Sequence, residues 1–146
     1  MGIDPSPSGP RGVACCQVGS GGQRGPTARI HVPRNLERRL DGCLLCVETP
    51  SAVFRKAAGK LLLGTAFQAG LSLAQARYGI AIHAEDWRQW LTGKRTASNR
   101  EIHDALLRHV ALPKRTNNHQ RDAVGIALYG LHLMGATWAL TGNGRS

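Results

Sequence analysis

The first third of the chain alternates short apolar stretches with turns rich in glycine, proline and serine. Residues 2–4, 12–18 and 27–32 are apolar enough to form strands. The first of these strands ends in an acid, Asp4, which is followed directly by Pro5. We expect the three strands to form an antiparallel meander that leaves Asp4 at a strand end.

The middle of the chain contains one unbroken apolar run and one long amphipathic stretch. A short helix is expected over residues 35–40. Residues 43–47 (CLLCV) then contain no polar alternation, which is typical of a central strand buried on both faces, and Glu48 follows them. Residues 51–78 carry apolar and basic positions at helical spacing and predict a long helix. Residues 79–83 (GIAIH) predict another short strand.

The C-terminal part of the chain is predicted to be helical. Residues 84–98 are polar and basic, and we assign no element to them. Ser98 predicts the cap of a helix over residues 99–110. The apolar segment 123–140 approaches the length of a membrane span, for which about 20 apolar residues are needed. Its glycines and its histidine favour a helix buried against a sheet or in a dimer interface. The expected order is βββαβαβαα, which is a mixed α/β fold.

Length and charge bound the class of protein. A chain of 146 residues is expected to form one domain, residues 1–146. Lysine and arginine number 19 against 9 acidic residues, and the net charge of +10 is spread over the whole length. This balance favours a polyanionic partner, nucleic acid before membrane. The first four residues lack the basic and apolar regions of a signal peptide, so we expect a cytoplasmic protein.

The four cysteines, Cys15, Cys16, Cys43 and Cys46, are numerous enough for a zinc site. Both pairs lie in strand-like runs, however, where residues one or three apart point to opposite faces. We therefore expect reduced core cysteines, with zinc or a disulfide as the alternative.

The positions of the acids are the most informative chemical feature of the sequence. Six acids lie in polar or helical surroundings and are explained as solvated surface: Glu37, Asp41, Glu85, Asp86, Glu101 and Asp104. By contrast, Asp4 and Glu48 follow apolar strands, and Asp122 lies in the first turn of the last helix. Carboxylates are almost never buried unless they are paired or bind a metal. If the two strands are neighbours and the helix begins at the same sheet edge, all three acids converge, together with His119 on the same helix face.

Such a cluster suits Mg²⁺ or Mn²⁺, which prefer carboxylate oxygens. On a basic protein it suggests phosphodiester hydrolysis with two ions about 4 Å apart. Asp4, Glu48, His119 and Asp122 are then the candidate catalytic residues and metal ligands. Each also has a simpler interpretation: a turn residue before Pro5 for Asp4, an arginine partner for Glu48, a helix-start acid for Asp122, and a cap or surface residue for His119.

Three motifs of the chain resemble those of RuvC-type Holliday junction resolvases, in the RNase H-like superfamily. They are residues 2–6 (GIDPS), the pair Val47-Glu48, and residues 119–127 (HQRDAVGIA). The stretch from Trp87 to Leu107 also resembles the segment that joins the last strand of the family to its next helix. In order, these matches cover nearly the whole chain. The chain looks like a compact phage-type or divergent member.

This resemblance implies an RNase H-like mixed sheet of about five strands flanked by helices. It implies that Asp4 bridges two Mg²⁺ ions, that Glu48 and Asp122 complete the site, and that His119 ligates a metal or helps to activate water. It further implies a homodimer that cuts four-way DNA junctions. The sequence departs from the family after Glu48, where Thr49 and Pro50 precede the position at which bacterial members often carry a junction-opening aromatic residue; the nearest aromatic here is Phe54.

Basic residues between positions 55 and 115 are candidates for phosphate contacts, which position a nucleic acid without reading its bases. The candidates are Arg55, Lys56, Lys60, Arg88, Lys94, Arg95, Lys114 and Arg115. Trp87 and Trp90 are expected to be packing residues, with stacking on exposed bases as the alternative. Two further functions stay open from the sequence: an RNase H-like nuclease that processes structured RNA, and a catalytically inactive DNA-binding module.

Overall fold

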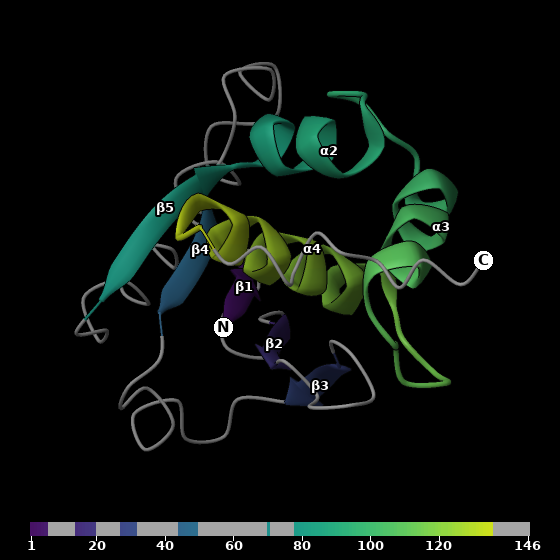
Figure 1. Cartoon of the computed structure of the whole chain (residues 1–146), viewed down its shortest axis with the longest axis horizontal. Helices are drawn as coiled ribbons and strands as arrows, with labels where there is room; N and C mark the ends of the chain where they lie inside the picture. The colour runs from purple at the N-terminus through teal and green to yellow at the C-terminus, as the bar shows by residue number, and fades with distance from the viewer. Residues whose placement is uncertain (6–13, 20–26, 32–43, 50–69, 71–77, 136–146) are drawn as a thin grey trace.

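The computed structural model describes residues 1–5, 14–19, 27–31, 44–49, 70 and 78–135 (Figure 1). The strands are β1 (Gly2–Asp4), β2 (Ala14–Gly19), β3 (Thr27–His31), β4 (Leu45–Thr49) and β5 (Gly79–His83), and the helices are α2 (Ala84–Thr92), α3 (Asn99–His109) and α4 (Asn118–Leu133). The helix predicted over 35–40 lies outside the described residues. Of the helix predicted over 51–78, only residues 70 and 78 are described. The mixed α/β class is confirmed.

The strands form one mixed sheet in the order β3-β2-β1-β4-β5. β1, β2 and β3 pair antiparallel, as the predicted meander requires, whereas β1, β4 and β5 run parallel. Parallel strands end at the same edge of a sheet, so the last residues of β1, β4 and β5 share one edge. These residues are Asp4, Thr49 and His83.

The apolar run of β4 forms the centre of the sheet, between β1 and β5. Leu45, Cys46 and Val47 are all buried, which confirms the prediction of a strand covered on both faces. The strand covers Leu45–Thr49, two residues later than the predicted 43–47. Glu48 therefore lies within the strand, where the sheet holds its backbone, and not in the turn that follows.

Helix α4 packs across β1 and β2, and α2 and α3 pack against α4 in turn (Figure 1). Residues 123–128 of the helix are all buried. At Gly2, a Cβ atom would collide with the backbone carbonyl of Ala123, so the close approach of α4 to β1 requires glycine at this position. The prediction that the last apolar segment lies against a sheet is confirmed. No helix among the described residues has the length and apolarity that crossing a membrane requires.

The limits of α4 differ from the prediction. The helix begins at Asn118, where Asn117 and Gln120 form a capping box, and ends at Leu133, followed by Gly135 with a φ of 74°. The apolar segment predicted over 123–140 covers only part of this helix, because the capping signal lies in the polar stretch before it. Asp122 is consequently one residue beyond the first turn, and residues 136–140 of the predicted segment lie outside the described residues.

Residues 84–98, to which the sequence analysis assigned no element, contain helix α2. That assignment was wrong because the polar residues of the stretch conceal an apolar stripe. Ala84, Trp87 and Leu91 are spaced three and four apart and are all buried. The helix ends at Gly93, which has a φ of 79°, in the left-handed region that favours glycine.

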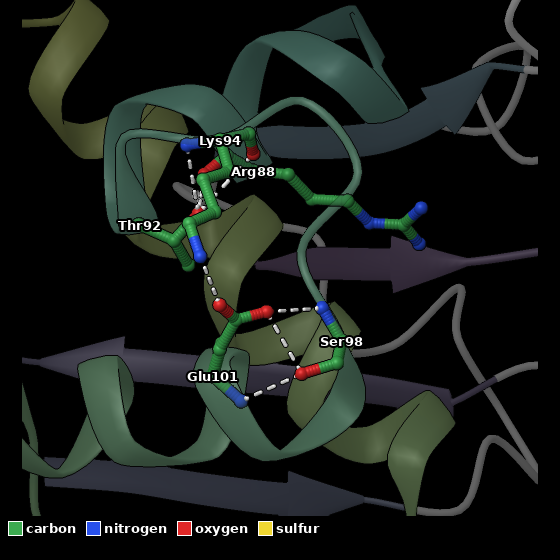
Figure 2. Close-up of polar contacts among 5 residues, drawn as sticks. All are labelled: Arg88, Thr92, Lys94, Ser98 and Glu101. Carbon is green, nitrogen blue, oxygen red and sulfur yellow. Dashed lines mark hydrogen bonds and ion pairs between the residues drawn. The ribbon is translucent and has the colours of Figure 1, made fainter.

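The connection between α2 and α3 is held by side-chain hydrogen bonds (Figure 2). Ser98 and Glu101 form a capping box, which confirms Ser98 as the cap of a helix that spans Asn99–His109. Lys94 binds the second oxygen of Glu101 at 2.5 Å, and the Thr92 hydroxyl donates to the Arg88 carbonyl at 2.8 Å. Figure 2 shows the Arg88 side chain pointing away from this network. The turn therefore fixes the backbone of α2 and leaves the Arg88 guanidinium for other contacts.

Cys46 is buried in the core and is a free thiol. This agrees with the prediction of a reduced core cysteine at that position. The side chains of Cys15, Cys16 and Cys43 lie outside the described part of the structure.

Candidate active site

Three carboxylates meet where the parallel strands end. Asp4 closes β1, Glu48 lies in the neighbouring strand β4, and Asp122 comes from α4, which crosses β1. Asp4 is buried, and the side chain of Asp122 is only 13 % exposed. The negative charges of Asp4 and Asp122 both raise the pKa of Glu48, which places the three groups within electrostatic reach of one another. The convergence predicted from the sequence is present in the structure.

His119 contacts the first of these acids. Its Nδ1 lies 2.7 Å from Oδ2 of Asp4, a distance typical of a charge-assisted hydrogen bond. The imidazole side chain is 65 % exposed, whereas that of Asp4 is 10 % exposed. His119 therefore lies between the buried carboxylates and the solvent.

The second acid is held by a tryptophan that the sequence analysis placed in the core. Trp87 is fully buried, as predicted, but its indole Nε1 donates a 2.7 Å hydrogen bond to Oε2 of Glu48. Sequence reasoning missed this contact because it assigned no helix to this region. The spacing of Ala84, Trp87 and Leu91, three and four residues apart, is the sequence signal that predicts a helix with Trp87 on its buried face.

The third acid forms an ion pair with the residue next to that tryptophan. The Nη2 atom of Arg88 lies 3.2 Å from Oδ2 of Asp122, and both side chains are mostly buried. The guanidinium also lies 5.1 Å from the centroid of the Trp87 ring. Its positive charge lowers the pKa of Asp4, Glu48 and Asp122 alike. Arg88 was predicted to contact DNA phosphates; in the structure it is the common counter-ion of the acids.

Burial dominates the acid–base properties of this cluster. Burial, reinforced by the charge of Asp4, raises the pKa of Glu48 to about 7. Burial likewise raises the pKa of Asp122 to about 6, although Arg88 opposes the shift. The pKa of Asp4 is raised for the same reason, partly offset by its hydrogen bond to His119. That hydrogen bond raises the pKa of His119 in turn.

The chemistry of the donor set fits a hard divalent cation. Three carboxylates supply oxygen ligands, and burial raises the pKa of all three, so a bound cation would favour their ionised forms. Each internal contact uses one carboxylate oxygen, which is Oδ2 of Asp4, Oε2 of Glu48 or Oδ2 of Asp122. Among the described residues, no group of three or more His, Cys, Asp or Glu side chains already has the arrangement of a metal site.

The other predicted contact residues lie in different settings. Lys94 is paired with Glu101, and Arg95 donates to the side chain of Gln89 at 3.0 Å. Lys114 and Arg115 are exposed in the loop between α3 and α4, just before the helix that carries His119 and Asp122. Arg55, Lys56 and Lys60 lie outside the described residues.

Trp90 is part of an aromatic cluster and not of the acid site. Its ring stacks on that of His132 with 5.1 Å between centroids and packs against Tyr129. Its packing role is confirmed.

The raised pKa values predict that the metal-free protein loses stability as the pH rises. Protonated Glu48 and Asp122 are favoured in the folded state, so their contribution is fully present below their ordinary pKa values of 4.5 and 3.8, respectively. It is lost as the pH rises through the folded-state pKa values of about 7 for Glu48 and about 6 for Asp122. We expect the free energy of unfolding, measured by denaturant titration in EDTA, to fall on the order of 1–3 kcal/mol between pH 5 and pH 8.

The Glu48→Gln variant is the matched control, because it retains every other titrating group and should show a smaller fall. Equal slopes with pH for the two proteins would contradict the shift assigned to Glu48.

Comparison with known proteins supports the fold independently of the site. The structure of RuvC from Thermus thermophilus matches this structure with a TM-score of 0.59 at 18 % sequence identity, over 92 % of this chain and 95 % of that chain. No family model matches the chain, and no curated protein has a significantly similar sequence. The resemblance noted from the sequence motifs is therefore confirmed at the level of the fold: the chain has a RuvC-like mixed α/β fold, and its similarity to that protein is distant.

Proposed function

We propose that this protein is a Mg²⁺-dependent endonuclease that cleaves branched DNA by hydrolysing phosphodiester bonds. The observation that carries the proposal is the convergence of Asp4, Glu48 and Asp122 at one sheet edge in a chain with a net charge of +10. A cluster of buried acids on a basic protein is explained when the acids hold a cation that faces a phosphate. The RuvC-like fold supports the same class of activity.

Asp4, Glu48 and Asp122 are the residues that would hold the metal. When bound, Mg²⁺ supplies activation of water and stabilisation of negative charge at the scissile phosphate. Two ions per site, with Mn²⁺ as a substitute, are what the sequence resemblance implies. Arg88, which forms an ion pair with Asp122, would compete directly with the cation there.

His119 is suited to handle a proton at the mouth of the site. Its ring is exposed, and its Nδ1 is bound to Asp4, which fixes the ring orientation and favours the charged form. The opposite nitrogen, Nε2, is then available to accept or donate a proton or to ligate a metal.

The substrate and assembly follow from the charge and from the resemblance. Lys114 and Arg115 are exposed beside the N-terminal end of α4, where a phosphate backbone entering the site would pass. Resemblance to RuvC-type resolvases implies a four-way junction as substrate and a homodimer as the active form. A symmetric dimer presents two equivalent sites to two opposed strands.

The central prediction concerns cleavage. Asp4→Asn and Asp122→Asn should each lower the rate of cutting of a synthetic four-way DNA junction in Mg²⁺ by roughly 100-fold or more, because losing a direct ligand should cost at least as much as losing an outer-shell partner. Asp104→Asn is the matched control, since Asp104 is an exposed acid on α3, away from the cluster, and should cut like the parent protein.

Parallel reactions with a linear duplex and with a structured RNA of equal length define the substrate. Preferential cutting of the RNA would replace branched DNA with RNA as substrate and keep the site. Junction binding without metal-dependent cutting of any substrate would indicate an inactive DNA-binding module. Undiminished cutting by both variants would refute the site.

A second prediction concerns DNA binding. Lys114→Ala and Arg115→Ala should each weaken junction binding in the absence of Mg²⁺ and reduce the slope of log affinity against log salt concentration by about 1. Arg108→Ala, an exposed arginine on α3 that is not among the predicted contacts, serves as the control. If the slope of log affinity against log salt concentration is unchanged in both variants, this loop does not contact the DNA.

A third prediction concerns assembly. At micromolar concentration, sedimentation should give a species of twice the 15.7 kDa chain mass. If the protein sediments only as a 15.7 kDa monomer when alone, and binds excess junction DNA only as a monomer, the dimer is contradicted and the active-site proposal stands.

A further inference from the structure

Helix α2 reaches the acid cluster through a buried tryptophan. The Trp87 side chain is 0 % exposed, and its Nε1 donates to Oε2 of Glu48 at 2.7 Å. An indole has a single N–H and accepts nothing, so this contact is directional and fixes one carboxylate oxygen. It leaves Oε1 of Glu48 outside the contact.

A glycine of α4 makes the position of the indole ring possible. A Cβ atom on Gly125 would lie 2.5 Å from Cζ3 and 2.7 Å from Cε3 of Trp87, closer than such atoms can approach. Any side chain at position 125 would therefore push the ring away, together with the N–H that it carries. Gly125 lies one helical turn after Asp122, so the same helix supplies an acid and the space for the ring that holds another acid.

A purely structural role for Trp87 does not explain its partner. A buried indole N–H generally finds an acceptor, and a backbone carbonyl would satisfy it at no electrostatic cost. Here the acceptor is the Glu48 carboxylate, whose ionisation the neighbouring charges of Asp4 and Asp122 already disfavour. The next residue, Arg88, binds a second member of the same cluster at 3.2 Å. Two consecutive residues of α2 thus orient two of the three acids.

We infer that Trp87 is a positioning residue that fixes the Glu48 carboxylate so that Oε1 faces the bound cation, and that Gly125 keeps the indole in place. In this role Trp87 acts through Glu48 and contacts neither the cation nor the substrate. The hydrogen bond itself is independent of the proposed nuclease function, whereas its consequence for the cation rests on that function.

The test reads the indole N–H directly in ¹⁵N–¹H correlation spectra of the full chain. The protein contains three tryptophans, and Trp87→Phe identifies the Trp87 signal by its disappearance. In metal-free protein we expect Glu48→Gln to move this signal, because the acceptor changes from a carboxylate to an amide, and to leave the Trp90 signal in place. A Trp87 signal that does not respond to Glu48→Gln would overturn the inference.

Titration with Mg²⁺ then measures the consequence. We expect Mg²⁺ to shift the Trp87 signal, and Trp87→Phe to weaken Mg²⁺ binding, followed by calorimetry, by about 10-fold to 100-fold, which is typical of losing a partner that orients a ligand. Gly125→Ala should weaken binding in the same direction while leaving both Trp87 and Glu48 in the chain. Trp90→Phe, on the same helix, should leave the affinity unchanged.

The outcomes separate the two proposals. If no signal of the wild-type protein responds to Mg²⁺, the metal-dependent function fails. If Mg²⁺ shifts signals at Asp4 and Asp122 and binds folded Trp87→Phe as tightly as the wild type, the site stands and Trp87 has no positioning role. Retained signal dispersion in the Trp87→Phe spectrum establishes that the variant is folded. The test of metal binding by the wild-type protein does not depend on the folding of any variant.

Discussion

The burial of three neighbouring carboxylates is the constraint on which the rest of this structure depends. Asp4, Glu48 and Asp122 each lose hydration on burial; in addition, the charge of Asp4 disfavours ionisation of Glu48 and Asp122, and that of Asp122 disfavours ionisation of Glu48. Each acid contacts one donor side chain: His119 contacts Asp4, Trp87 contacts Glu48 and Arg88 contacts Asp122. Two of these donors are adjacent residues of α2, so that helix is part of the site and not only a cover for the sheet.

The close packing of α4 on the sheet follows from the same requirement. For Asp122 to reach the acids at the ends of β1 and β4, the helix must cross the strands at short range. Glycines permit this approach from both sides: Gly2 on β1 faces the backbone of α4, and Gly130 on α4 faces the thiol of Cys46 on β4. Gly125 does the same for the Trp87 ring. Gly130, one of the glycines that made the last apolar segment a poor membrane span, is therefore also a residue that lets it lie against the sheet.

The site was more predictable from the sequence than the helices around it. Acids at the ends of apolar runs are an unusual pattern, and the parallel pairing of β1 with β4 is enough to bring Asp4 and Glu48 together. Helix α2 was missed because its single buried stripe is diluted by charged residues, and a polar stretch gives no strong periodicity. The capping box of α4 was missed because it lies in that kind of polar sequence.

The partners of the acids could not be predicted from sequence spacing. Arg88 is 34 residues from Asp122, and Trp87 is 39 residues from Glu48, so only tertiary packing brings them together. A basic residue in a basic protein suggests a surface that binds phosphate, and that expectation hid the role of Arg88 as an internal counter-ion. Charge composition describes the average surface, whereas the ionisation of a buried group depends on its immediate neighbours.

The same electrostatic cost links stability to function in this protein. A cluster of acids with raised pKa values destabilises the folded chain near neutral pH, and local conflicts of this kind are expected where a site is built for a ligand and not for the fold. A divalent cation would remove the conflict more completely than Arg88 and His119, because it brings two charges to the oxygens that repel one another. In that case the internal donors have a second use. They hold the carboxylates close together before the cation arrives, so that less conformational freedom is lost when it binds.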